Sequence, residues 1–164
     1  MSKFLLIGLG NIGAEYAHTR HNIGLDVLDA FVIKHGGFFK MDRLAEVAEV
    51  KWKGKVFICI KPTTFMNLSG KAFKYWMDKE KVDLENTLTI VDDLALPINK
   101  LRFGIGNNFA KGQQVDFVLG KWAQDERKTI DLKIQKSVEV IESFAAIGLA
   151  RTMTMANGMD IKPE

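Results

Sequence analysis

The sequence has a single cysteine among its 164 residues, and this scarcity limits the chemistry that the chain can support. One cysteine cannot form an intrachain disulfide, so the composition fits a reducing compartment and we expect a cytoplasmic protein. Cys59 lies within the apolar run "KVFICIKP", where a free thiol normally packs as a small hydrophobic side chain. We therefore predict that Cys59 is buried in a strand.

Long apolar runs, internal repeats and low-complexity segments are also missing. The apolar stretch after Lys3 stops at glycines and is too short for the core of a signal peptide. No later segment approaches the roughly 20 apolar residues of a membrane span, so we expect no membrane partner. A hydrophobic content of 47% and a charged content of 26% are ordinary for a globular protein, and we expect one domain over residues 1–164.

Neither sign of charge dominates the composition. The 23 Lys and Arg residues and 20 Asp and Glu residues give a formal net charge of +3, which permits an anionic partner without requiring one. Lysines on a solvated face are common, so a nucleic-acid surface needs local evidence. The basic side chains that could contact phosphates are Arg20, Lys51, Lys53, Lys55, Lys71, Lys74, Lys100 and Arg102.

Helical periodicity appears in three parts of the chain. It begins near Asn22 and stops at Gly36, begins again near Asn67 or Ser69, and continues over 124–148 behind an acidic first turn. The last of these helices has an apolar stripe formed by Ile130, Ile134, Val138, Ile141 and Ala145. The tail over 151–164 has no clear pattern, and we expect its end to be mobile.

Strand patterns alternate with these helices, which predicts an α/β domain whose sheet is covered on both faces. The expected strands are at 4–7, in a hairpin over 45–62, within 86–97 and within 100–107. The hairpin requires antiparallel pairing, whereas strands separated by helices favour parallel pairing. The pattern therefore predicts a mixed sheet.

Glycines at 8, 10 and 13 follow the first strand and spell the G-x-G-x-x-G pattern of dinucleotide sites. Such a site needs a helix that starts inside the motif and an acidic residue at a strand end about 20 residues on. Here the helix starts only near Asn22, and the acids at that separation fall within it. A nucleotide-binding enzyme is thus a minor alternative, and we interpret the glycines as a sharp bend that brings Asn11 beside other groups.

Several long segments resemble the bacterial-type peptidyl-tRNA hydrolase family and occur in the family's order. They are "LIGLGNIGAEYAHTRHNIG" (6–24), "KPTTFMNLSGKA" (61–72), "VDDLALP" (91–97), "FGIGN" (103–107) and "VLGKW" (118–122). The resemblance implies a single-domain fold of the phosphorylase/hydrolase-like type, with a twisted mixed β-sheet covered by helices on both faces. It also implies a metal-independent esterase that needs no cofactor, acts as a monomer on the acceptor end of peptidyl-tRNA and releases free tRNA for translation.

The resemblance further implies which residues carry the reaction. His21 matches the family's catalytic histidine, the general base toward the water that attacks the ester. Asp92, the first acid of "VDDL", matches the carboxylate that pairs with this histidine; from the residues alone, Asp92 or Asp93 could simply cap a turn. An ester is already activated, so a positioned water and a base with a pKa near 6.5 suffice for its hydrolysis.

Four further residues match the family's substrate cleft. Asn11 and Asn67 match the asparagines that position substrate, and Tyr16 and Met66 match residues that line the same cleft. Carboxamides can donate to a carbonyl or oxyanion and accept from water or a peptide N–H, without charge. Asn67 could instead be only the N-cap of the second helix, and Met66 could be a core residue. His18 and His35 have no identifiable partner, and we expect them at the surface.

One unit of the family is absent. The family has a loop with a "GHNG" signature and a helix between the acidic strand end and the "GIG" strand, whereas here "LPINKLR" runs directly into "FGIGN", so the unit is absent between Arg102 and Phe103. Either the printed sequence omits a unit that the protein contains, or the deletion is covalent and the polypeptide itself lacks the unit. A covalent deletion would weaken tRNA or peptide binding, which leaves a tRNA- or ribosome-binding module with impaired catalysis as the alternative function.

Overall fold

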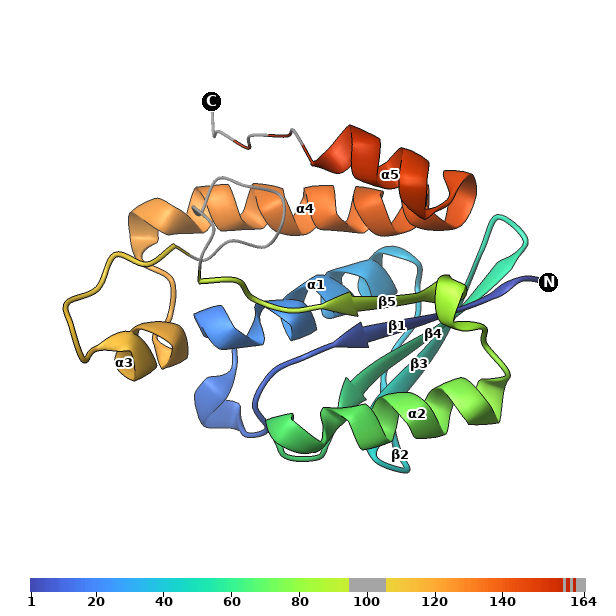
Figure 1. Ribbon diagram of the computed structural model, residues 1–164, viewed down its shortest axis with the longest axis horizontal. Helices are drawn as coiled ribbons and strands as arrows, with labels where there is room; N and C mark the ends of the chain where they lie inside the picture. Colours follow the sequence, from blue (N-terminus) through green and yellow to red (C-terminus); the bar gives the residue numbers. More distant parts are fainter. Residues whose placement is uncertain (95–105, 158, 160, 162–164) are drawn as a thin grey trace.

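The computed structural model describes residues 1–94, 106–157, 159 and 161, which contain a five-stranded sheet with the order β2-β3-β4-β1-β5 (Figure 1). The strands are β1 (Lys3–Gly8), β2 (Lys40–Asp42), β3 (Ala45–Trp52), β4 (Lys55–Pro62) and β5 (Thr87–Ile90). β1 pairs in parallel with both β4 and β5, while β2, β3 and β4 pair antiparallel. The mixed sheet and the hairpin are as predicted; the strand expected within 100–107 falls largely outside the described residues.

The inner strand β1, between β4 and β5, is buried on both faces, which explains its unbroken apolar sequence. Successive strand side chains point to opposite faces, so Phe4 and Leu6 enter one core cluster, and Leu5 and Ile7 enter the other. Cys59 in the neighbouring β4 is completely buried, as predicted, and burial raises the pKa of its thiol. The two clusters define the two helix-covered faces of the sheet.

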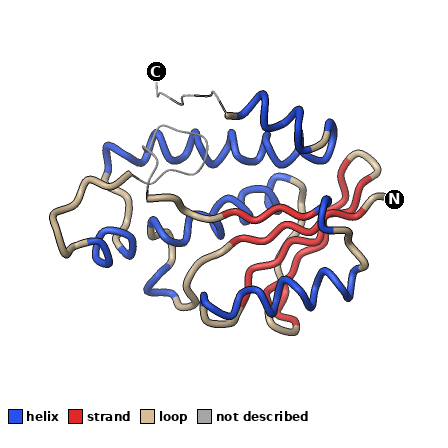
Figure 2. Tube along the Cα trace, viewed as in Figure 1, coloured by secondary structure: helices blue, strands red, loops and turns tan. Residues whose placement is uncertain are grey.

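Helices α1 (Ile23–Lys34) and α4 (Gln124–Ile147) cover the first face, and α2 (Ser69–Glu80) covers the second (Figure 2). The predicted stripe of α4 is confirmed, since Ile130, Val138, Ile141 and Ala145 are buried and Ile134 packs against the same cluster. On the other face, the buried Trp76 of α2 donates its indole N–H to the carbonyl of Arg43 at 2.9 Å. The fold class predicted from the sequence is therefore confirmed.

The C-terminal tail differs from the prediction, because its first part forms α5 (Leu149–Ala156). Gly148, with a φ of +82°, ends α4 and lets the chain turn back, so that α5 packs against α4. The short helix α3 (Gln114–Leu119) precedes α4 in the chain. No helix in the described ranges is long and apolar enough to cross a membrane.

Two histidines expected at the surface have partners. His35 is largely buried beside Phe31 and Trp52, and its Nε2 lies 3.0 Å from Oε1 of Glu142 on α4. His18 is exposed, but its Nδ1 lies 3.0 Å from Oδ1 of Asp26. The sequence could not reveal the His35 pair, because 107 positions separate its members.

Candidate active site

The candidate site lies at one edge of the sheet, where the parallel strands β4, β1 and β5 all end. Ile7 of β1 is opposite Ile60 of β4, and Gly8 is opposite Ile90 of β5. The segments that leave these strands therefore start side by side (Figure 1). They carry the short 3₁₀ turns η1 (Ala14–Tyr16) and η2 (Arg20–Asn22) after β1, η3 (Met66–Leu68) after β4, and residues 91–94 after β5.

Glycines allow the first turn of α1 to approach these strand ends closely. A Cβ at Gly8 would lie 2.5 Å from the carbonyl oxygen of Gly24, and a Cβ at Gly24 would overlap the carbonyl oxygen of Ile90. Because α1 begins at Ile23 and not inside the glycine motif, the helix does not have the start that a dinucleotide site requires. The glycines serve close packing, which places η2 beside the end of β5.

His21 and Asp92 are brought together by this packing. Nδ1 of His21 lies 2.9 Å from Oδ1 of Asp92, and the two side chains are 22% and 9% exposed. An ionised carboxylate can only accept, so Nδ1–H donates and Nε2 carries the lone pair of the neutral ring. This hydrogen bond raises the pKa of His21 above its ordinary value of 6.5, although partial burial opposes the shift. Among the described residues no hydrogen bond reaches Nε2 of His21, so the arrangement is suited to a base that is oriented through its Nδ1.

Asn11 is held by a residue that the sequence interpretation did not single out. The backbone N–H of Asn11 donates to Oδ1 of Asn22 at 2.8 Å, and Nδ2 of Asn22 donates to the carbonyl of Asn11 at 2.9 Å. Asn22 is buried, and a Cβ at Gly10 would lie 2.7 Å from its Oδ1. The glycine bend was predicted to bring Asn11 beside another group, and that group is the side chain of Asn22, the residue after His21. We call these two hydrogen bonds the Asn22 clamp.

Tyr16, Met66 and Asn67 border the same edge of the sheet, but in the described residues no hydrogen bond or ion pair joins their side chains to His21 or Asp92. Asn67 is exposed within η3, and Met66 and Tyr16 are half-buried. Leu68 occupies the N-cap position of α2 and no side chain caps it, so Asn67 does not have the capping role considered above.

Arg20 is buried and paired, which makes it a poor candidate for phosphate contact. Its Nη2 donates to Oε2 of Glu126 at 2.6 Å, and the residue is 8% exposed. Of the other basic residues considered, Lys51, Lys53, Lys71 and Lys74 are exposed, and Lys55 is half-buried. Lys100 and Arg102 lie outside the described residues.

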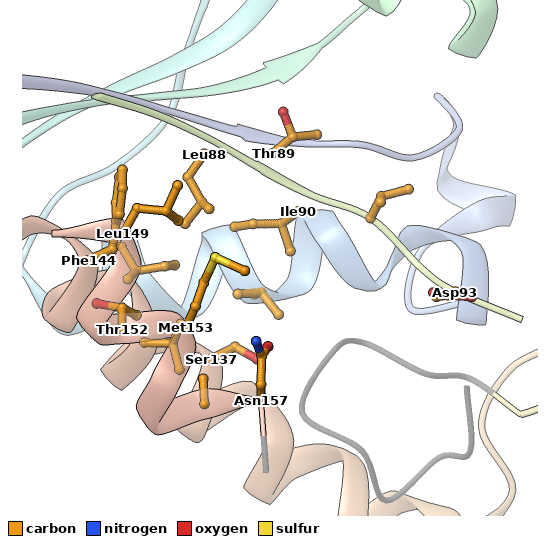
Figure 3. A pocket seen from close by; sticks show the side chains of 15 residues that line it. Leu88, Thr89, Ile90, Asp93, Ser137, Phe144, Leu149, Thr152, Met153 and Asn157 are labelled. Atoms are coloured by element: carbon orange, nitrogen blue, oxygen red, sulfur yellow. The ribbon is translucent and has the colours of Figure 1, made fainter. Parts of the chain in front are cut away.

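Two cavities flank this region. A cavity of about 380 Å³ with a mixed polar and apolar lining has Asn11 and Asn22 in its wall, together with Lys61, whose Nζ lies 2.9 Å from Oδ1 of Asp29. An apolar cavity of about 410 Å³ lies between β5, α4 and α5; Phe144 and Met153 are among its lining residues (Figure 3). Within the described ranges, no group of three or more His, Cys, Asp and Glu side chains is placed to hold a metal ion.

A family model and individual sequence relatives of this chain both point to the same protein family. A family model described as peptidyl-tRNA hydrolase matches residues 5–103 and 97–164. Peptidyl-tRNA hydrolases of Cytophaga hutchinsonii and Phocaeicola vulgatus are 44% and 41% identical to this chain over 184 positions, covering 94% of the chain and 98% of each relative.

The solved structure of peptidyl-tRNA hydrolase from Acinetobacter baumannii superposes with a TM-score of 0.86 at 22% identity. The superposition covers 96% of this chain and 95% of that one, and shows that the two share a fold. The family model and the sequence relatives together establish that the chain belongs to the peptidyl-tRNA hydrolase family.

Proposed function

We propose that this chain hydrolyses the ester bond between a peptide, or an N-blocked aminoacyl group, and tRNA, and so releases free tRNA for translation. The observation that carries the proposal is the 2.9 Å contact between His21 and Asp92 at the ends of parallel strands, in a chain that belongs to this family. An ester needs only a positioned water and a base of suitable pKa, and the pair supplies that base.

In the proposed mechanism, Nε2 of neutral His21 accepts a proton from water while the water oxygen attacks the ester carbonyl. The imidazolium that forms is stabilised by Asp92, which accepts the Nδ1–H bond and fixes the tautomer. The proton then passes to the ribose oxygen as the ester bond breaks. General-base assistance of this kind contributes about 100- to 10,000-fold to the rate.

We assign substrate positioning to Asn11 and Asn67, with Tyr16 and Met66 lining the cleft. Support for Asn11 is that the Asn22 clamp fixes its backbone next to the His21 turn. An exposed Asn67 has a carboxamide available to a ligand. Both amides can bind the ester and peptide groups of a substrate without adding charge that would perturb the base.

The substrate sets the expected partner and compartment. We propose that the chain binds the acceptor end of tRNA and the attached peptide as a monomer in the cytoplasm, where translation produces peptidyl-tRNA. Binding through phosphates makes affinity salt-dependent and largely indifferent to sequence. Two lysines on α2 are exposed toward such contacts: Lys71, and Lys74, whose Nζ also lies 3.1 Å from Oδ2 of Asp78.

We also propose that the family's loop-and-helix unit is absent from this chain between Arg102 and Phe103. Two observations support this. The alignments with relatives run over 184 positions, more than the 164 residues of this chain, so the relatives contain positions without a counterpart here. The family model matches the chain in two separate ranges, 5–103 and 97–164, which overlap over 97–103. The intact mass of the purified natural protein decides whether the unit is deleted from the protein itself or is missing only from the printed sequence.

Cleavage of diacetyl-lysyl-tRNA by the chain tests the proposed function. We expect release of free tRNA that is abolished by His21→Ala. If the chain binds the substrate but releases no tRNA, the hydrolase proposal is wrong for this chain and the tRNA-binding alternative replaces it. Saturable binding of NAD would support the nucleotide-binding alternative.

A further inference from the structure

Arg20 directly precedes His21, and its guanidinium is held by the segment that joins α3 to α4. Besides its bond to Glu126, Nη1 donates to the carbonyl of Lys121 at 2.8 Å. The guanidinium carbon lies 4.3 Å from the ring centroid of Phe117 and 5.1 Å from that of Trp122. This combination of a forked donor and aromatic neighbours is specific for arginine, because lysine cannot reproduce its planar geometry.

The same segment also holds the backbone around Arg20. The N–H of Arg20 donates to the carbonyl of Gly120 at 3.0 Å, and Thr19 forms an antiparallel bridge with Lys121. A Cβ at Gly120 would lie 3.2 Å from Nη1 of Arg20, so glycine leaves room for the guanidinium. The turn that carries His21 is therefore attached to the α3–α4 segment through both main chain and side chain.

Glu126 connects this attachment to the start of α4. Its Oε2 accepts from Arg20 and also from the backbone N–H of Ala123 at 2.8 Å, the N-cap residue of α4. The carboxylate thus stabilises a helix N-terminus and binds the guanidinium with the same oxygen. Through Glu126, the long helix α4 fixes the position of Arg20.

Arg20, His21 and Asn22 are consecutive in the 3₁₀ turn η2, in which successive side chains point about 120° apart. Arg20 contacts the α3–α4 segment, His21 bonds to Asp92 after β5, and Asn22 clamps Asn11. The turn is thus fixed from different sides of the site. We expect a shift of the Arg20 attachment to reach the His21 ring, because one short 3₁₀ turn carries both side chains.

We propose that the Arg20–Glu126 pair is a positioning device that holds the imidazole of His21 within bonding distance of Asp92. The inference rests on the proposed role of His21 in hydrolysis. Arg20 and Glu126 are positioning residues and act on the reaction only through the His21 turn. Loss of the pair lengthens the His21–Asp92 bond, which lowers kcat and leaves substrate binding almost unchanged.

The direction of the change in the His21 pKa separates positioning from a direct charge effect. Arg20→Met removes a cation and leaves the Glu126 carboxylate, so a direct electrostatic effect would raise the pKa of His21. Loss of the Asp92 bond removes the main cause of the present elevation and lowers the pKa toward 6.5. Only the positioning proposal predicts a decrease.

The experiment is an NMR titration of the imidazole signals in the folded chain, which has only three histidines to assign. We expect a lower His21 pKa in Arg20→Met than in the unsubstituted chain. The matched control is Arg127→Met, which removes an exposed arginine from a 3.0 Å pair with Asp131 on α4, and should leave His21 unchanged. In the tRNA-release assay, kcat of Arg20→Met should fall about 10- to 100-fold while KM stays within about twofold.

Arg20→Lys provides a second variant if Arg20→Met does not fold. Lysine keeps the positive charge but cannot reach Glu126 and the Lys121 carbonyl together. Positioning therefore predicts a lower His21 pKa, whereas a direct charge effect predicts no change in that pKa. An unchanged or higher His21 pKa in either folded variant would overturn the inference. Because the titration needs no turnover, it tests positioning even if the chain fails to cleave peptidyl-tRNA, an outcome that contradicts only the proposed function.

Discussion

Nδ1 of His21 lies 2.9 Å from Oδ1 of Asp92, although 71 positions separate the two residues in the chain. The contact depends on parallel pairing of β1 with β5, because His21 follows β1 and Asp92 follows β5. It also depends on the glycine contact between α1 and both strand ends. Predictions about the base therefore divide into those that alter its chemistry and those that alter the packing that holds it.

His21→Ala should abolish most tRNA release while leaving the fold and tRNA affinity nearly unchanged. The ring is partly exposed, so its loss leaves little empty space, whereas the proposed base is removed. We expect a decrease of about 100- to 10,000-fold in kcat. Single-turnover cleavage and filter binding measure the two quantities, and near-normal cleavage by the variant would exclude His21 as the base.

Asp92→Asn should lower both the maximal rate and the pKa seen in the pH–rate profile. The Asp92 hydrogen bond is the main cause of the raised His21 pKa, so its loss moves the pKa toward 6.5. The base must be neutral to act, and the acidic limb of the kcat profile should therefore shift to lower pH. A limb that stays in place would show that Asp92 does not set the pKa of the base.

The same pair predicts a pH-dependent contribution to stability. A His21 pKa that is higher in the folded than in the unfolded chain stabilises the fold fully below the unfolded value. This contribution is lost as the pH rises through the folded value, so Asp92→Asn should destabilise the protein more at about pH 5 than at about pH 9. Denaturant unfolding at both pH values provides the measurement, and equal losses would contradict the prediction.

Gly24→Ala should destabilise the domain and disturb the site together. The added Cβ would overlap the carbonyl oxygen of Ile90, so α1 must move away from the strand ends, at a cost of about 1–3 kcal/mol. Gly70→Ala is a suitable control, because Gly70 lies in α2 with open space around its Cβ position. The control should gain about 0.5–1 kcal/mol from helix propensity. Thermal unfolding compares the variants, and equal stabilities would argue against the close contact.

Much of the fold could be predicted because its signals are local. The apolar run of β1, the hairpin over 45–62 and the stripe of α4 each follow from side-chain period, and the structure contains all of them. The helix α5 was missed because Thr152 and Thr154 interrupt its apolar residues, and because its packing against α4 is a tertiary contact.

The site was less accessible to sequence reasoning. The proposed roles of His21 and Asp92 came from the family resemblance, because no spacing rule joins residues in segments after different strands. The sequence suggests Arg20 only as a possible phosphate contact, because its partners Glu126, Phe117 and Trp122 lie about a hundred positions further along. The matching segment at 118–122 contains one of these partners, and was the available signal that the two regions meet.

The complete burial of Cys59 in β4 has a practical consequence. Thiol reagents react with cysteines that are exposed and ionised. Cys59 is not exposed, and burial raises the pKa of its thiol and so disfavours ionisation. A cysteine introduced at an exposed position of α2 can therefore carry a fluorophore or spin label without prior removal of the natural one. The native chain is a suitable starting point for following tRNA encounter by site-specific spectroscopy.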